Sequence, residues 1–349
     1  MRARNDCICI GHDLRPVAMV FQSTKAGIRK FASRSIPLTV LAFLADDLLA
    51  RLGVADANPA AGEHLSGADV ESDIAYARQV VESYAANGAI NGRVAEIGPG
   101  GSAASALFLI AEGAQRVDLL DRFVFPHDNR KLAETYSAII ERSAKLSALF
   151  PRGNLSPRIA FHAGEEAAAE QFFGCRPLAY DVICSCAVLE HVTDPLAVVR
   201  AATASLVDGG RQIHFIDLRD HGMFSGGGRH PLTFLTLPAG IYRRMSQRRG
   251  RPNRILIDRY RCELGRLPLE WEIKVTCLAG VGPVEPQPYS AIPEKLRAVA
   301  ETHVETIRPS LAPEFRDLSS ADLAIDGLLL TATKIGVPQL DRSSFPVST

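Results

Sequence analysis

Strand-like and helix-like patterns alternate through the middle of the chain. Short apolar runs recur between residues 93 and 218, and each is followed by a segment with helical periodicity. The strands predicted in this way are 93–98, 116–121, 158–164, 181–188 and 211–218. Helices are expected between them, the longest over about 128–149. This order predicts a parallel sheet covered by helices on both faces.

The alternation breaks after the fifth predicted strand. Residues 219–268 are rich in glycine, proline and arginine, and we expect them to form a lid inserted into the domain. Strand patterns return at 269–279 and 326–336, with a helix near 293–305 between them. Residues 338–349 are expected to be a loose tail.

The N-terminal region has a different pattern. Residues 1–34 are basic with little periodicity, 36–53 fit an amphipathic helix, and 55–67 have the composition of a linker. Ser66 is a candidate cap for a helix that reaches about Ala86. We therefore divide the chain into an arm with a helix (1–65), a main domain (66–337) and the tail.

Composition excludes several classes of protein. The chain is 47% apolar and 22% charged, and 39 basic residues balance 39 acidic ones, so no global charge favours DNA. The best apolar run, 36–45, is about half of a membrane span, and no signal peptide is evident. The seven cysteines are odd in number and lack paired C-x2-C spacing, which indicates a reducing, cytoplasmic setting without a metal site.

The segment VAEIGPGG (94–101) carries the first candidate chemistry. Its strand leads into a turn formed by Gly98, Gly100 and Gly101, and glycines there let the backbone approach a ligand at a helix N-terminus. The spacing also fits a dinucleotide turn. Glu96 favours another ligand, because a carboxylate suits a cationic amino-acid group and is poorly placed for a pyrophosphate.

Two further carboxylates follow later strands. Asp121 ends the second predicted strand, where an acidic side chain accepts hydrogen bonds from ribose hydroxyls of an adenosine ligand. Glu165 follows the third strand, as a candidate for contact with the adenine amino group or as a carboxylate favoured at a helix start.

Taken together, VAEIGPGG, LLD, AGEE, DVICSCAVLEHVTDP and LVDGGRQIHFIDL resemble the class I S-adenosylmethionine-dependent methyltransferases, over about residues 90–218. The resemblance is closest to the group with L-E-H-V after strand four. It implies an α/β, Rossmann-like fold with a seven-stranded mixed sheet whose last strand is antiparallel, and S-adenosyl-L-methionine as cofactor. Ser102 stands where many members have glycine.

The resemblance also implies roles for particular residues. Glu96, Gly98 and Gly100 would hold the methionine part, with Gly101 standing in for the missing glycine. Asp121 would hold the ribose, and Glu165 would lie by the adenine. Near the sulfonium, the cofactor would be lined by Ser185, Cys186 and Ala187. His191 is shared by the group, so we interpret it as structural or cofactor-adjacent.

Methyl transfer requires alignment of the acceptor more than acid–base chemistry, although a hydroxyl acceptor benefits from a base. The candidates follow the fifth strand: His214, Asp217, Asp220 and His221. We prefer His221, with Asp217 next. A solvated loop histidine is the alternative.

Eight arginines and one acid occupy residues 242–261. Guanidinium groups bind phosphates and carboxylates in a bidentate manner, so Arg243, Arg244, Arg248 and Arg249 predict a small anionic acceptor of sugar or natural-product type. A solvated basic loop is the alternative, and RNA binding is weaker because few aromatics are interleaved.

The sequence therefore predicts a methyltransferase that acts on O or N. An NAD(P)-dependent oxidoreductase would need an apolar residue at position 96 and a catalytic Tyr/Lys pair, neither of which is apparent. A non-catalytic cofactor-binding scaffold is disfavoured by the retained Glu96, glycines and Asp121.

Overall fold

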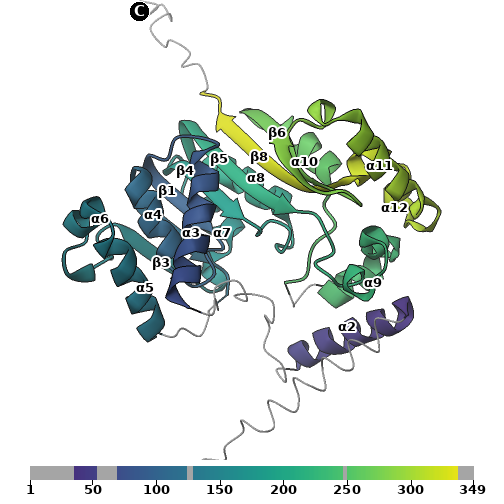
Figure 1. Cartoon of the computed structure of the whole chain (residues 1–349), viewed down its shortest axis with the longest axis horizontal. Helices are drawn as coiled ribbons and strands as arrows, with labels where there is room; N and C mark the ends of the chain where they lie inside the picture. The colour runs from purple at the N-terminus through teal and green to yellow at the C-terminus, as the bar shows by residue number, and fades with distance from the viewer. Residues whose placement is uncertain (1–34, 53–68, 124–128, 247–249, 337–349) are drawn as a thin grey trace, which may run out of the picture.

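The structure is a computed structural model that describes residues 35–52, 69–123, 129–246 and 250–336. In these residues eight strands form one sheet, in the order β3-β2-β1-β4-β5-β8-β6-β7 (Figure 1). The strands are β1 (Gly92–Ile97), β2 (Ala114–Asp121), β3 (Ile159–Ala163), β4 (Tyr180–Cys186), β5 (Leu206–Asp217), β6 (Leu269–Leu278), β7 (Gly282–Gln287) and β8 (Ile325–Lys334). Strands β1 to β5 are parallel, and β8 runs antiparallel between β5 and β6.

This arrangement confirms the predicted Rossmann-like fold and its antiparallel last strand. The expected number of strands differs by one, because the chain adds β7 as a hairpin on β6. Its sequence GPVEPQ contains two prolines, which cannot donate backbone hydrogen bonds. Prolines are tolerated in β7 because it lies at the edge of the sheet.

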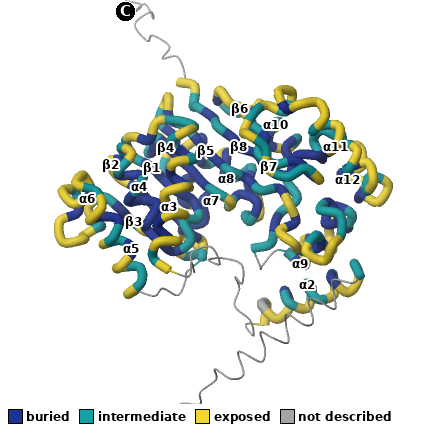
Figure 2. Tube along the Cα trace, in the orientation of Figure 1, coloured by how far each residue is buried: buried dark blue, intermediate teal, exposed yellow. Residues whose placement is uncertain are grey.

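Helices cover both faces, as the alternation predicted (Figure 1). Apolar side chains of α3 (Val70–Ala85), α4 (Ala104–Glu112), α5 (Asn129–Glu141) and α6 (Ala144–Leu149) pack against one face. The other face carries α7 (Ala169–Gly174), α8 (Pro195–Ser205), α10 (Ile257–Leu264), α11 (Glu294–Glu305), α12 (Pro313–Arg316) and α13 (Ser320–Leu323). The strands between them are mostly buried (Figure 2). None of the described helices is long and apolar enough to cross a bilayer.

Side-chain caps explain where α3 and α6 begin. The Asp69 carboxylate caps α3 by accepting a hydrogen bond from the Ser72 backbone N–H at 2.8 Å. The cap of this helix is therefore three residues later than Ser66, the residue expected from the sequence. The helix expected over about 128–149 is divided, because Ser143 caps α6 separately. The arm (1–34), the linker (55–67) and the tail (338–349) lie outside the described residues.

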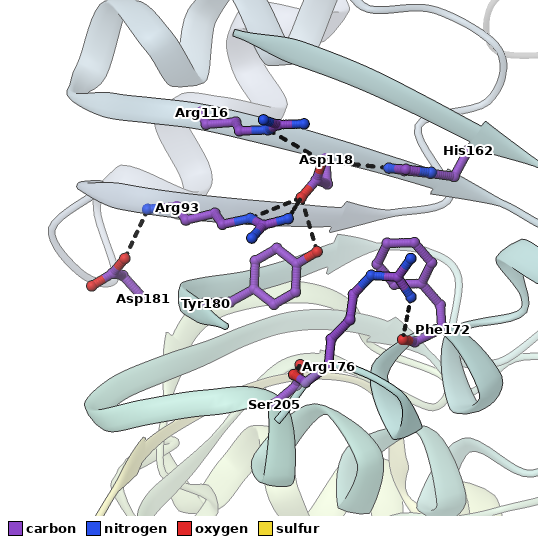
Figure 3. A network of polar contacts seen from close by, with 9 residues as sticks. All are labelled: Arg93, Arg116, Asp118, His162, Phe172, Arg176, Tyr180, Asp181 and Ser205. Atoms are coloured by element: carbon purple, nitrogen blue, oxygen red, sulfur yellow. Dashed lines mark hydrogen bonds and ion pairs between the residues drawn. The ribbon is translucent and has the colours of Figure 1, made fainter. Parts of the chain in front are cut away.

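A buried carboxylate joins three neighbouring strands, β1, β2 and β4, by hydrogen bonds. Asp118 of β2 is 1% exposed and accepts hydrogen bonds from Arg93 at 2.7 Å and from the Tyr180 hydroxyl at 2.9 Å (Figure 3). Burial opposes ionisation, but these hydrogen bonds hold the pKa of Asp118 below its usual range. The network joins β1, β2 and β4 away from their carboxyl ends, and we interpret it as structural.

The inserted region packs against the N-terminal helix rather than standing alone. Helix α2 (Ile36–Arg51) contacts α9 (Ala239–Ser246), and the two helices lie beside each other in Figure 1. Phe43 of α2 meets Phe224 edge to face, with ring centroids 6.2 Å apart. Helix α2, which belongs to the predicted N-terminal region 1–65, therefore packs against the insertion at 219–268.

Candidate functional site

A cavity of about 720 Å³ opens at the carboxyl edge of the parallel strands. It is lined by the segments that follow β1, β2, β4 and β5, together with α3 and the beginning of α7. Strand β1 lies between β2 and β4, so the chain crosses to opposite sides of β1 at this point. In open α/β sheets, ligands bind at such a reversal of strand order.

The turn after β1 requires glycine. Gly98, Gly100 and Gly101 have φ angles of 70°, 71° and 83°, in the left-handed region. A Cβ atom on Gly98 would also lie 2.4 Å from Cγ2 of Val188. Gly98 and Gly100 line the cavity, whereas Gly101 is buried just behind it. The turn therefore presents backbone to a ligand.

Glu96 lies near the end of β1 and lines the same cavity. Its side chain accepts hydrogen bonds from the Ser105 hydroxyl at 2.5 Å and the Tyr84 hydroxyl at 3.3 Å. The residue is 3% exposed, and burial raises the pKa of Glu96 to about 7. A cationic group bound next to this carboxylate would favour its ionised form.

Asp121, the last residue of β2, is the second carboxylate of the cavity. It accepts hydrogen bonds from the backbone N–H groups of Phe123 at 2.9 Å and Gly100 at 3.3 Å. Burial raises the pKa of Asp121 to about 6. The glycine turn and the two carboxylates thus meet at one site, as their positions at strand ends predicted.

Glu165 lies farther out than expected. It is exposed, forms an ion pair with Arg122 at 2.9 Å and does not line the cavity, although Arg122 does. A contact between Glu165 and an adenine stays a prediction, and it would require the pair to rearrange.

The three candidates at the end of β4 divide between the cavity and the core. Cys186 and Ala187 line the cavity. Ser185 is fully buried, and its hydroxyl lies 2.8 Å from Nδ1 of His214. His214 is itself buried, which lowers its pKa to about 3. Ser185 and His214 therefore form part of the sheet interior, and neither lines the cavity.

The segment after β5 forms the other end of the cavity. His221 and Asp217 both line it, with 3.6 Å between Nε2 of His221 and Oδ2 of Asp217. Burial lowers the pKa of His221, so its imidazole is neutral at pH 7. Burial opposes ionisation of Asp217, but hydrogen bonds from Arg219 hold the pKa of Asp217 below its usual range. The structure thus brings together the two predicted catalytic residues. Asp220, in contrast, accepts backbone hydrogen bonds that fix the turn.

Two residues beside His221 were not among the predicted catalytic groups. Glu190 is 2% exposed, its carboxylate oxygens have no hydrogen-bond partner of normal geometry among the described residues, and burial raises its pKa to about 8. The His191 ring lies 4.7 Å from that of His221, and burial lowers the pKa of His191 to about 4. The L-E-H-V segment was visible in the sequence, but only the fold brings it next to His221.

The arginine cluster is largely outside the cavity. Arg243 and Arg244 lie in the last turn of α9, are exposed and do not line the cavity, while Arg248 and Arg249 are outside the described residues. Three other arginines of residues 242–261 form ion pairs with acidic side chains: Arg251 with Asp46, Arg254 with Glu314, and Arg261 with Asp322.

No protein-family model and no curated protein sequence matches the chain. Solved structures do match it. One, from Listeria monocytogenes, is described as a putative S-adenosylmethionine dependent methyltransferase (16% identity, 75% of this chain and 98% of that chain covered, TM-score 0.41). Another S-adenosylmethionine dependent methyltransferase is from Mesorhizobium loti (15% identity, 75% of this chain and 100% of that chain covered, TM-score 0.38). A third match is phosphoethanolamine N-methyltransferase 2 from Haemonchus contortus (12% identity, 74% of this chain and 52% of that chain covered, TM-score 0.37).

Proposed function

We propose that the protein binds S-adenosyl-L-methionine in this cavity and transfers its methyl group to an oxygen or nitrogen atom of a small acceptor. The observation that supports this most is the pair of buried carboxylates, Glu96 and Asp121, on either side of a glycine turn. Glu96 suits the ammonium group of the methionine part, and Asp121 suits the ribose hydroxyls. A dinucleotide would instead place a pyrophosphate near the Glu96 carboxylate, which repels it.

The proposed reaction needs few groups. The acceptor atom attacks the methyl carbon in line, and the C–S bond breaks with its electron pair passing to sulfur. The cavity contributes alignment and exclusion of water. His221, with Asp217 beside it, is our candidate for taking the proton of a hydroxyl acceptor, since a neutral imidazole can accept one.

The acceptor is proposed to be anionic. Arg122 and Arg219 line the cavity, and Arg243 and Arg244 add positive charge on the nearby insertion. Guanidinium groups of this kind suit phosphate or carboxylate. Arg122 and Arg219 are each bound to an acidic side chain in the structure, so an acceptor would have to share them.

Calorimetry with S-adenosylhomocysteine and with NAD tests the cofactor. We expect Asp121→Ala to weaken binding of S-adenosylhomocysteine by well over tenfold, because it removes two hydrogen bonds to a charged group, each contributing about 1.5–3 kcal/mol. Glu112→Ala, which removes an exposed carboxylate at the end of α4, is the matched control and should bind as the wild type does.

Tighter binding of NAD than of S-adenosylhomocysteine, or unchanged affinity in Asp121→Ala, would contradict the proposal. Binding of S-adenosylhomocysteine without methyl transfer to any acceptor tried would favour the scaffold alternative.

A further inference from the structure

Three side chains that can bind a metal ion meet at the end of the cavity formed by the segment after β5. Glu190, His191 and His221 each offer one ligand atom, and these atoms lie within 4.8 Å of one another. Glu190 and His191 follow β4 and His221 follows β5, so two adjacent parallel strands deliver them to the same edge. Both histidines line the cavity.

The Glu190 carboxylate is the clearest sign of a missing partner. It is 2% exposed, and neither of its oxygens makes a hydrogen bond of normal geometry with the described residues, although the backbone N–H groups of Glu190 and Asp217 partly offset the rise in its pKa that burial causes. A buried polar group without a partner is costly, and native proteins retain such groups where they serve a purpose. The nearest candidate for an ion pair is Nε2 of His221, 4.0 Å from Oε1. A cation between these two atoms would satisfy both.

His191 is oriented as metal-binding histidines usually are. Its Nδ1 lies 2.6 Å from the carbonyl oxygen of Gly250, so Nδ1 carries the proton and donates it to that oxygen. The lone pair of Nε2 is thereby left for another partner. A hydrogen bond from the second ring nitrogen to a backbone carbonyl is the arrangement that fixes the tautomer and direction of a metal-binding imidazole.

The turn after β5 fixes His221, and the acidic groups around it differ in how far they are already paired. Its φ angle is 49°, an uncommon value for a residue other than glycine, so the turn holds this side chain in place. Asp217 lies 3.6 Å from Nε2 but is bound to Arg219 at 2.6 Å, which neutralises much of its charge. Glu190 is therefore the acidic ligand of the group, and a bound cation would favour its ionised form, which burial alone opposes.

We propose that Glu190, His191 and His221 bind one divalent transition-metal ion. Two imidazoles and one carboxylate suit first-row ions such as Zn²⁺, Fe²⁺ or Co²⁺ better than Mg²⁺ or Ca²⁺, which prefer oxygen ligands alone. Bonds of about 2.0–2.2 Å place ligand atoms about 3.4 Å apart, so side-chain movements of about 1 Å close the site.

A bound ion changes the role of His221. Three protein ligands leave coordination positions toward the cavity for water or an acceptor oxygen. Nε2 of His221 would then bind the ion and no longer act as the base. The cysteine spacing predicted no metal site, whereas these Glu and His ligands come from segments 30 positions apart.

The test uses the full chain without a histidine tag, freed of metal by a chelator and without cofactor. Co²⁺ is followed by its visible absorption and Zn²⁺ by calorimetry. We expect one equivalent to bind, and Glu190→Gln and His221→Asn to weaken binding by at least about tenfold. His162→Gln, which replaces a histidine of β3 outside the group, is the matched control and should bind as the wild type does. An equal concentration of Mg²⁺ should not compete.

Absence of saturable Co²⁺ and Zn²⁺ binding would overturn the proposal. So would unchanged affinity in Glu190→Gln, a near-isosteric variant whose folding is checked by circular dichroism. Binding of S-adenosylhomocysteine is measured on the same preparations, so a failed metal titration and a failed cofactor proposal give different results.

Discussion

At the residue scale, the two carboxylates of the proposed cofactor site should make binding depend on pH. Burial raises the pKa of Glu96 to about 7 and that of Asp121 to about 6 in the free protein. The proposed ligand favours both ionised forms, so binding lowers these pKa values and releases protons. Affinity should therefore be highest above pH 7 and should fall as the pH decreases toward 5.5, by up to about tenfold per pH unit for each group.

Calorimetry with S-adenosylhomocysteine between pH 5.5 and 8.5 measures this dependence. In Glu96→Gln the change near pH 7 should disappear, while the change near pH 6 from Asp121 persists. A constant affinity across the range in the wild type would mean that neither carboxylate ionises on binding.

Which single residues the sequence could identify depends on how their roles arise. Glu96 and Asp121 were predictable, because the end of a parallel strand places a side chain at the ligand edge whatever the rest of the fold does. Ser185 was predicted to line the cavity together with Cys186 and Ala187, but successive strand residues face opposite sides, so Cys186 lines the cavity and Ser185 lies in the sheet interior. Glu190 differs because its significance is burial without a partner, a property of tertiary packing.

At the scale of elements, α9 supplies a test of the anionic acceptor. Arg243 and Arg244 are exposed and outside the cavity, so they should act at long range and be screened by salt. Replacing both by alanine should raise the KM of an anionic acceptor by about two- to thirtyfold at low salt, since each exposed pairing contributes about 0.2–1 kcal/mol. The difference from the wild type should vanish at high salt.

These KM values can be measured from the release of S-adenosylhomocysteine, with pairs of acceptors that differ only by a phosphate group. The control removes the same charge by replacing Arg152 and Arg158, which precede β3 at the opposite edge of the sheet. Equal KM values for the α9 variant and the wild type at every salt concentration would leave these arginines as a solvated basic surface.

Strands with clear apolar runs were predictable, and the edge strand β7 was not. The first five strands and the last one follow from apolar runs, because buried parallel strands need them. The β7 hairpin strand lacks such a run, since GPVEPQ is partly exposed and contains two prolines. β7 forms because β6 has an unpaired edge to which it can hydrogen-bond, and no local sequence pattern reveals that edge.

At the scale of the whole molecule, α2 and the insertion form one packed unit from distant parts of the sequence. Phe43 packs against Phe224, and the guanidinium of Arg251 lies 4.5 Å from the centroid of the Phe43 ring. Arg251 also forms an ion pair with Asp46. Composition predicted a lid, but contacts across some 200 residues cannot be read from one sequence. Helix α2 thus packs against and stabilises the segment that carries His221 and Gly250.

Removing the Phe43 ring should loosen that segment without unfolding the sheet. Phe43→Ala deletes the contact with Phe224 and the surface under Arg251, a loss of about 1–2 kcal/mol in local stability. Amides of α2 and of the insertion should then exchange with solvent about five- to thirtyfold faster, because they open locally, while β1, β4 and β5 keep their protection. Hydrogen–deuterium exchange followed by mass spectrometry measures this. Leu41→Ala is the matched control, since Leu41 is on the same helix but 61% exposed. Equal exchange in the two variants would show that α2 does not hold the insertion in place.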